Sequence, residues 1–354
     1  MKIFKYFVII SFVALIAIFF TVRSHTVQNI LIKLDFDRRI NKPNPLPTED
    51  ALTAVLCGSR GPLPAAYVAE TCILIKAGKK VFIVDAGDGS VSNLRNWRID
   101  LGDVNAFLLT HTHSDHYSDL ADLHLGGWVI QNRQKKLKVY GPEGTESITS
   151  GFEKAYQLDY KWRNEHHGDE VAPLDVAGFD THIIDLNSSV IIEEDGLKVT
   201  AFLVQHDPVT PSVGYRFDYK GRSITISGDT SYSENLIKHA MNTDVLFHEA
   251  LSNVMNTAAA NIANDNPATK GIGTILIDVL DYHTAPAQAA KAANLANAKR
   301  LIFYHLIPYP DGLIAKMIFL RGVDKVRDEW TLGKDGTMVI LPANSSEINL
   351  TTIE

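Results

Sequence analysis

The feature that most constrains this chain is the run Thr-His-Thr-His-Ser-Asp-His at residues 110–116. Four side chains that can bind a metal ion lie within it: His111, His113, Asp115 and His116. The apolar stretch just before them is typical of a buried strand. Because alternate residues of an extended chain point to one side, His111 and His113 can face the same metal. A turn into a helix brings the other two towards a second metal, and such ligands suit zinc or another first-row divalent ion.

Three further candidate ligands lie where apolar strands are expected to end. His206, Asp229 and His305 each follow a run of apolar or β-branched residues and precede a loop. Strands hold such side chains rigidly at one rim of a sheet, while loops admit a substrate. Taken singly, each is more often a turn or capping residue. Beside the run at 110–116 they predict one shared site, in which a carboxylate such as Asp229 can bridge two cations.

These motifs together resemble the metallo-β-lactamase superfamily of dinuclear hydrolases. The order His-x-His-x-Asp-His, His, Gly-Asp-Thr, His spans most of residues 50–341. Within the superfamily the likeness is closest to the tRNase Z and arylsulfatase-like branch. Supporting segments are Leu56-Cys57-Gly58-Ser59, the Asp-Ala-Gly-Asp-Gly run at 85–89, His248-Glu249-Ala250 and His283-Thr284. The resemblance implies an α/β fold, a four-layer αβ/βα sandwich with two sheets face to face and helices outside.

The resemblance also implies the metal ligands. They are His111, His113 and His206 for one metal, Asp115, His116 and His305 for the other, and Asp229 between them. Two divalent metal ions follow, with Zn²⁺ as the first expectation and Mn²⁺ or Fe²⁺ as alternatives.

The expected reaction is hydrolysis of a phosphodiester or sulfate ester by a hydroxide held between the two metals. Asp115 can accept a hydrogen bond from that hydroxide as well as bind metal. His283 is the candidate proton donor to the leaving oxygen. Glu249 is expected to orient His283, as the Glu and His of the resembling branch imply, although its residue type alone fits a structural partner equally well.

The expected substrate is a small molecule. Proteins of the tRNase Z type carry a basic arm between the third metal histidine and Gly-Asp-Thr, but only 23 positions separate His206 from Asp229 here. The net charge of −7 also argues against nucleic acid as a partner. Alternatives are a lactonase or other carboxylic ester hydrolase, a tRNase Z-type endoribonuclease and, in a different class, a di-iron redox protein. A homodimer stays open, because dimers are common among similar proteins.

The N-terminus directs the chain to a membrane. An apolar run extends from Tyr6 to Val22, just long enough to cross a bilayer. We interpret residues 1–23 as an uncleaved signal anchor, with a cleaved signal peptide as the alternative. Residues 24–50 are expected to form a stalk, 51–341 the hydrolase domain and 342–354 a C-terminal tail. The domain is expected on the outer side of an inner membrane, or exported after cleavage.

Further expectations concern individual elements. Gly221 is expected in the turn of a hairpin, and residues 329–341 are expected to form another hairpin. Cys57 and Cys72 form either a disulfide or two small buried hydrophobes. Helices are expected near 117–132, 144–158, 231–241 and 286–297. Five histidines outside the motifs are read as surface residues or as residues behind the site: His124, His166, His167, His182 and His239. The polar stretch ending at His166 and His167 is a candidate lid.

Overall fold

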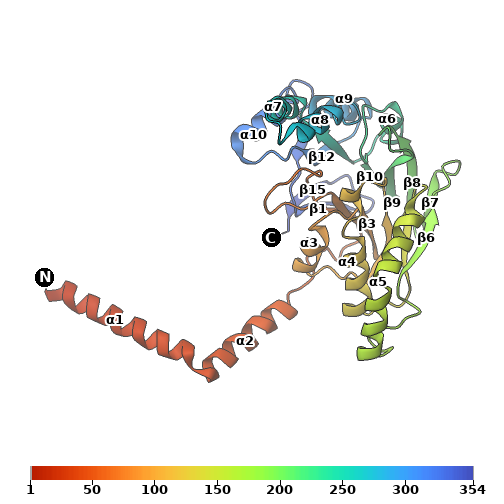
Figure 1. Ribbon diagram of the computed structural model, residues 1–354. Helices are drawn as coiled ribbons and strands as arrows, with labels where there is room; N and C mark the ends of the chain where they lie inside the picture. Colours follow the sequence, from red (N-terminus) through yellow and green to blue (C-terminus); the bar gives the residue numbers. More distant parts are fainter. Residues whose placement is uncertain (1, 354) are drawn as a thin grey trace. The chain divides into compact units, whose positions relative to one another are not determined.

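The computed structural model describes residues 2–353 (Figure 1). The chain divides into two compact units, Met1–Asn44 and Pro45–Glu354. The smaller unit contains two helices, α1 (Lys2–Arg23) and α2 (His25–Ile40). Within the described residues one helix, Phe4–Arg23, is long and apolar enough to cross a membrane. The segment expected to be a stalk is therefore largely helical, and the extended part is confined to the Pro-rich residues after Asn41.

The larger unit is built on two β-sheets. The first sheet contains, in spatial order, β15 (Asn349–Thr352), β14 (Thr337–Pro342), β1 (Ala51–Gly58), β2 (Cys72–Ala77), β3 (Lys80–Val84), β4 (Val104–Leu108), β5 (Leu137–Gly141) and β6 (Phe179–Ile183). The second contains β13 (Trp330–Leu332), β12 (Arg300–Ile307), β11 (Val245–Leu251), β10 (Arg222–Ile226), β9 (Ser212–Tyr219), β8 (Leu197–Val204) and β7 (Val190–Glu194).

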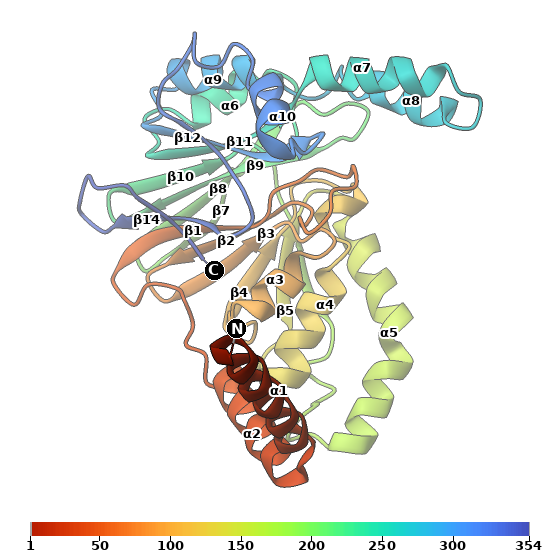
Figure 2. The same cartoon turned by 90° about the vertical axis from the view of Figure 1, so that its left-hand side faces the viewer.

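Helices cover the outer face of each sheet, which gives four layers (Figure 2). Those beside the first sheet are α3 (Ser90–Asn96), α4 (Leu120–Leu125) and α5 (Thr145–His167). Those on the side of the second sheet are α6 (Glu234–His239), α7 (Asn253–Asn264), α8 (Lys270–Asp278), α9 (Pro286–Leu295) and α10 (Gly312–Phe319). The expected αβ/βα sandwich is confirmed.

Apolar packing fills each of the three spaces between layers. The central core joins the inner faces of the sheets through residues such as Phe82, Phe217 and Tyr304. A second core lies between the first sheet and its helices, and a third lies between the second sheet and helices that include α6 and α9. Buried on both faces, the strands are rigid supports for whatever their ends carry.

The expected turn at Gly221 is present, and it is tight. Tyr219 pairs with Arg222, so Lys220 and Gly221 form a two-residue hairpin loop between β9 and β10. Both have positive φ, 44° and 78°, as the turns that match the strand twist require. The helix expected over 117–132 is interrupted, because the consecutive residues Gly126 and Gly127 open its end into a π-helical turn over Gly126–Ile130.

The expected hairpin over residues 329–341 is wrong. β13 pairs with β12 in the second sheet, whereas β14 pairs with β1 in the first. The segment between them crosses from one sheet to the other, and Asp335 holds it there. Its carboxylate accepts hydrogen bonds from Ser59 Oγ at 2.7 Å and the Ala69 amide at 2.9 Å. Residues 333–336, which resembled a turn, therefore connect the two sheets, and we call this segment the strap.

The C-terminal residues differ from the expected tail. β15 pairs antiparallel with β14 and extends the first sheet, and Ile353 is buried in the core beneath it. The alternation of polar and apolar residues in so short a strand gives little signal, which explains why it was missed. The two cysteines, left open above, form a disulfide between Cys57 of β1 and Cys72 of β2.

His124 is not a surface residue. It is fully buried, stacks on Trp128 with ring centroids 5.8 Å apart, and accepts a hydrogen bond from the Gly178 amide at 3.2 Å. Burial, followed by the charges of Arg133 and Lys136, lowers its pKa to about 3. The other four unassigned histidines are exposed or half-buried, and His166 and His167 end α5.

His124 therefore makes folding pH-dependent. Its pKa in the folded state lies below the ordinary value, so the unfolded state takes up the proton first as the pH falls. The stability that it contributes is complete above about pH 6.5 and is lost between pH 6.5 and 3. At pH 4.5, two units below the ordinary pKa of 6.5, we expect a loss of roughly 3 kcal/mol from this residue alone. His124→Gln, which keeps an acceptor for Gly178, should flatten the profile in urea unfolding.

The exposed His167→Gln is the matched control, since it also removes one imidazole. Its stability profile between pH 4 and 7 should follow that of the unchanged protein. If His124→Gln retained the full acid sensitivity, titration of His124 would not be its source.

Candidate metal centre

All seven predicted ligands lie at one rim of the sandwich, where strands of both sheets end. His111, His113, Asp115 and His116 follow β4, the last two within a short 3₁₀ turn over Ser114–His116. His206 follows β8, Asp229 follows β10, and His305 lies near the end of β12. We call these residues the seven-residue cluster. Segments far apart in the chain thus meet because parallel strands end on the same side of a sheet.

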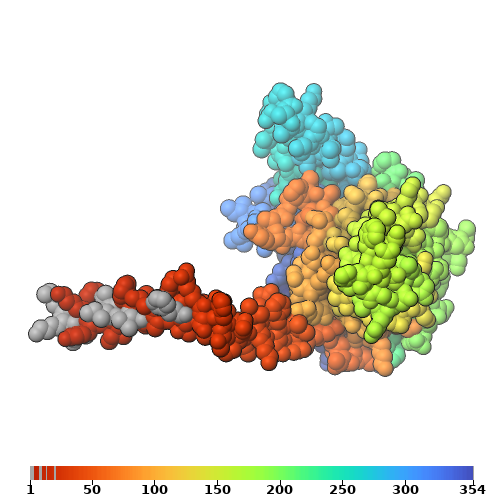
Figure 3. All heavy atoms as spheres, turned by 60° about the horizontal axis from the view of Figure 1, so that its bottom comes forward, coloured from red at the N-terminus to blue at the C-terminus, as the bar shows by residue number. Residues whose placement is uncertain are grey.

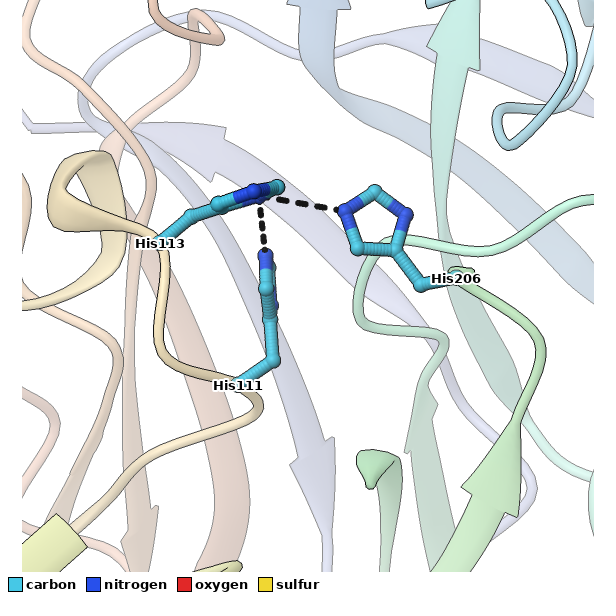
Figure 4. Close-up of side chains that lie close together, drawn as sticks. All are labelled: His111, His113 and His206. Atoms are coloured by element: carbon cyan, nitrogen blue, oxygen red, sulfur yellow. Dashed lines mark hydrogen bonds between the residues drawn. The ribbon is translucent and has the colours of Figure 1, made fainter. Parts of the chain in front are cut away.

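Three imidazoles of the cluster form a tight triangle (Figure 4). His113 Nδ1 lies 3.0 Å from His111 Nε2 and 3.2 Å from His206 Nε2, and the three nitrogens converge on one point. Nitrogen ligands about 2.0–2.1 Å from a tetrahedral Zn²⁺ stand roughly 3.3 Å from one another. Two sides of the triangle are therefore close in length to the edges of a coordination tetrahedron.

A second group surrounds the carboxylates. His305 Nε2 lies 3.2 Å from Asp115 Oδ2 and 3.2 Å from Asp229 Oδ2. His116 Nε2 lies 3.5 Å and 3.3 Å from the same two oxygens. Asp229 Oδ2 also stands 3.9 Å from His111 Nε2, a member of the first triangle. Asp229 thus lies between the two groups, in the position that a bridging ligand requires.

The side chain of His305 reaches the cluster through a bulge in its strand. β12 does not end at Tyr304, as the sequence suggested, but continues to Ile307. Glu249 of β11 pairs with Tyr304 and Ala250 pairs with Leu306, so His305 is the extra residue of the bulge. Its φ of 45° lies in the left-handed region. Such bulges redirect a side chain, and here the redirected side chain is a candidate ligand.

Asp85 is a site residue that the motif analysis did not single out. Its Oδ2 accepts hydrogen bonds from His116 Nδ1 at 2.9 Å and from Thr110 Oγ1 at 2.8 Å, and its Oδ1 accepts from the Thr110 amide at 2.9 Å. These contacts fix the His116 ring so that Nε2 faces the cluster. The Asp85–Ala86–Gly87 run after β3 was noted, but only its pairing with β4 shows the role.

The electrostatics of the triangle favour neutral imidazoles. Burial is the main cause of the shifts at His111 and His113. It lowers the pKa of His111 well below the ordinary value and also lowers the pKa of His113. Burial also lowers the pKa of His206 to about 4. At neutral pH these rings therefore have lone pairs available to bind a cation without first losing a proton.

The second group differs because its imidazoles face carboxylates. Burial alone would lower the pKa of His116, but Asp229, Asp115 and Asp85 raise it well above the ordinary value. Burial would raise the pKa of Asp115, yet His116 and His305 hold it at about 2. The carboxylates are thus ionised and demand a positive charge beside them. A divalent cation bound here would supply that charge in place of the protons on the imidazoles.

Unpaired buried atoms support the same conclusion. His116 Nε2 and Asp229 Oδ1 are fully buried and have no hydrogen-bond partner among the described residues. Leaving such groups without a partner costs free energy, and a coordinated ion removes that cost. Two groups of suitable ligands match the expected sets, His111 with His113 and His206, and Asp115 with His116 and His305. The residues present therefore fit a pair of divalent metal ions.

His283 and Glu249 lie beside this cluster. The His283 ring centroid is 5.1 Å from that of His206 and 5.7 Å from that of His305. Glu249, fully buried in β11, stands 3.4 Å from His283 Nδ1 through its Oε1 and accepts a hydrogen bond from the Thr284 amide at 2.7 Å. Glu249 therefore holds the 283–284 segment in place, and His283 faces the same space as the cluster.

A cavity of about 70 Å³ opens onto the cluster. Its floor contains His113, Asp115, Asp229 and His283. Its walls are largely apolar and come from the loop after β1, from α8 and the segment that follows it, and from β12: Pro62, Leu63, Ile275, Leu276, Val279, Tyr282 and Ile307. The candidate lid at His166 and His167 does not line it.

A two-sheet sandwich that gathers imidazoles and carboxylates at one rim is the arrangement of metal-dependent hydrolases with the metallo-β-lactamase fold. Residues 80–306 match the family model described as the beta-lactamase superfamily domain, and the chain belongs to that family. The resemblance recognised from the sequence is thereby confirmed, and the chain is a metal-dependent hydrolase of this superfamily.

Relatives and solved structures agree with this assignment. A ribonuclease Z from Mycobacterium sp. (strain KMS) is 30% identical over 258 residues, which cover 73% of this chain and 85% of the relative. The metallo-β-lactamase fold protein YhfI from Bacillus subtilis superposes with a TM-score of 0.60 at 18% identity, covering 82% of this chain and 100% of that one. A diphosphatase of the PhnP family superposes with a TM-score of 0.56 at 16% identity, covering 86% and 100%.

Removing the charge of Asp85 should weaken metal binding without dismantling the fold. We expect Asp85→Asn to lower the affinity for a divalent ion by about 10- to 100-fold, since partners that orient a ligating histidine have effects of this size. Asn tolerates the positive φ of 58° at this position. The measurement is metal retained against a competing chelator. The exposed Asp88→Asn, on the same loop, should retain metal as the unchanged protein does.

Proposed function

We propose that this hydrolase is a dinuclear metal enzyme that cleaves phosphodiester or sulfate-ester bonds in small molecules. The observation that carries the proposal is the position of Asp229 between two complete ligand groups. A carboxylate so placed can serve two cations at once. The cavity of about 70 Å³ above it supports small esters as substrates.

The ligands of the proposal are the seven-residue cluster. His111, His113 and His206 hold one ion, Asp115, His116 and His305 hold the other, and Asp229 serves both. Zn²⁺ is our first choice, because imidazole and carboxylate ligands suit it. When bound, a pair of divalent ions lowers the pKa of a water molecule and polarises the ester oxygen.

Side chains of this protein accept and donate the hydrogen bonds and protons that the reaction needs. Asp115, ionised and on the cavity floor, can accept a hydrogen bond from the attacking water and so orient it. His283 faces the same cavity and donates a proton to the oxygen of the departing alcohol. Glu249 is a positioning residue, since it stands 3.4 Å from His283 Nδ1 and does not line the cavity.

The second candidate is an endoribonuclease, favoured by the name of the ribonuclease Z relative. Two observations support small substrates instead. Between His206 and Asp229 the chain forms only a loop and the β9–β10 hairpin, with no room for a basic arm. Within the described part of the chain, no Lys or Arg lines the cavity. A polynucleotide substrate needs cationic contacts to its phosphates.

We also propose that the hydrolase domain lies outside the cytoplasm, anchored by α1. The apolar segment Phe4–Arg23 is long enough to span a bilayer. The disulfide between Cys57 and Cys72 supports an oxidising compartment, because structural disulfides are rare in the cytosol. Cleavage of the segment as a signal peptide would leave the same domain exported.

Replacing Asp229 should abolish both metal binding and catalysis. We expect about two metal ions per chain by elemental analysis, and cleavage of bis-p-nitrophenyl phosphate, p-nitrophenyl sulfate or both. A simple lactone and a precursor tRNA complete the panel. In Asp229→Ala we expect loss of metal and a fall in turnover of about a thousandfold or more, because the shared ligand is gone. The exposed Asp311→Ala is the control.

Several outcomes would contradict the proposal. Cleavage of the lactone alone would assign a carboxylic ester hydrolase, and cleavage of precursor tRNA alone would assign a ribonuclease. Two irons without ester turnover would indicate a redox protein. Full activity in Asp229→Ala would show that the reaction does not need Asp229 as a shared ligand.

Replacing His283 should slow substrates according to their leaving group. An alkoxide needs a proton as it departs, whereas p-nitrophenolate does not. We expect His283→Gln to lower the rate for methyl or ethyl leaving groups by about 10²- to 10⁴-fold and to change p-nitrophenyl release little. The measurement is kcat against leaving-group pKa. An equal fall for every leaving group would show that His283 positions substrate and does not donate a proton.

A further inference from the structure

The walls of the cavity differ from its floor in polarity. The floor is ionic and belongs to the cluster and His283, but every wall is apolar. One wall is the loop after β1, which contributes Pro62 and Leu63. Gly61 brings this loop close, since a Cβ there would come within 2.6 Å of Ile307 and 3.0 Å of the His305 ring. Another wall is α8, through Ile275 and Leu276. A cavity that is ionic at one end and apolar along its sides is built for an amphiphile.

Helix α8 carries the apolar surface out of the cavity. Ile272, Ile275 and Leu276 of α8 and Val279, the residue that caps its C-terminus, recur at the spacing of one helical face. Leu276 is buried, Val279 is half-buried, and Ile275 and Ile272 are 58% and 52% exposed. The stripe thus begins among the cavity residues and ends in solvent. More than half of each of the isoleucines Ile272 and Ile275 is therefore open to solvent, although Ile275 also lines the cavity.

The helix pair α7–α8 is the part of the chain between Glu249 and His283. It protrudes from the body of the larger unit, at the top of the space-filling view (Figure 3). α10 packs against α7 and exposes a second apolar group, Leu313, Ile314 and Met317, at 75%, 74% and 67%. Apolar side chains are therefore exposed on α10, the neighbour of α7, as well as on α8.

We propose that the substrate is an amphiphilic ester whose apolar group, an alkyl chain, lies along the stripe Leu276–Val279–Ile275–Ile272. This inference rests on the proposed function and names its substrate class. The anionic ester group lies on the cavity floor beside the seven-residue cluster. Hydrolysis breaks the bond between phosphorus (or sulfur) and the oxygen of one alcohol; water supplies the hydroxyl that replaces it and the proton that the departing oxygen receives.

The narrowness of the cavity supports a slender group over a bulky one. A volume of about 70 Å³ admits the ester group and the first carbons of a chain, and is far below the 300 Å³ or more typical of pockets that enclose a whole ligand. The remaining carbons must lie on the exposed stripe. Each methylene fully buried increases affinity about fourfold, so a chain half covered by α8 should gain about twofold per carbon.

The binding test uses the full chain in lipid nanodiscs, loaded with Zn²⁺, and n-alkylphosphonates from ethyl to octyl. These ligands are not hydrolysed, and calorimetry reports their affinity directly. We expect the affinity to rise about twofold with each methylene, an octyl-to-ethyl ratio of about 60. The alkylphosphonates also partition into the lipid of the disc. This contribution is the same for every variant, so it cancels when variants are compared.

Two substitutions locate the path, and a third is their control. Ile275→Asn, at the cavity wall, should weaken binding from butyl upwards. Ile272→Asn, one turn further out, should weaken only the longer chains. Ile262→Asn is the matched control, an isoleucine of α7 that is 75% exposed and does not line the cavity. All three positions are exposed, so the fold tolerates the change.

Hydrolysis of alkyl p-nitrophenyl phosphates from methyl to octyl separates this inference from the proposed function. No cleavage of any of them, with metal bound, would overturn the proposed phosphodiester reaction. Cleavage with kcat/KM independent of chain length, or the same loss in Ile262→Asn as in Ile275→Asn, would overturn the amphiphile alone. Tighter binding of a short oligoribonucleotide than of octylphosphonate would replace it with a nucleic-acid substrate.

Discussion

The carboxylate of Asp229 is the group on which the rest of the structure depends. It is buried among imidazoles of both sheets, and its Oδ2 lies 3.3 Å from His116 Nε2 and 3.2 Å from His305 Nε2. Taking such charges out of water costs several kcal/mol each unless their partners are held in place. The three apolar cores provide that rigidity, because they fix the strand ends from which the ligands come. The fold is in this sense a frame for one cluster of charges.

The ligands were predictable because their signal is local. Four of them lie within residues 111–116, and His206 and Asp229 each follow an apolar strand that the sequence marks clearly. The tight turn at Gly221 is a local signal as well. These residues predicted that the cluster meets at one rim and carried the resemblance to the family, and the resemblance in turn implied the layered fold.

What the sequence did not reveal depends on contacts between distant segments. Asp85 has its role only because β3 lies beside β4 and brings it to His116. His305 points into the cluster only because of a bulge against β11. His124 looked like a polar helix residue, yet an aromatic cluster buries it. β13 and β14 form no hairpin, because each finds a better partner in a different sheet. Short polar segments of this kind take their structure from their neighbours.

The pairing of β1 with β14 sets the order in which the molecule can be completed. Val55 lies opposite Met338. The first sheet is therefore complete only when β14, near the C-terminus, has paired with β1, near the start of the domain. Contacts across such a separation form late. Until they form, the strap at Asp335 has no place to bind, and Ser59 and Ala69 lack the acceptor that it supplies. A chain of this design emerges from the ribosome without a finished sheet, a state compatible with threading through a membrane before folding.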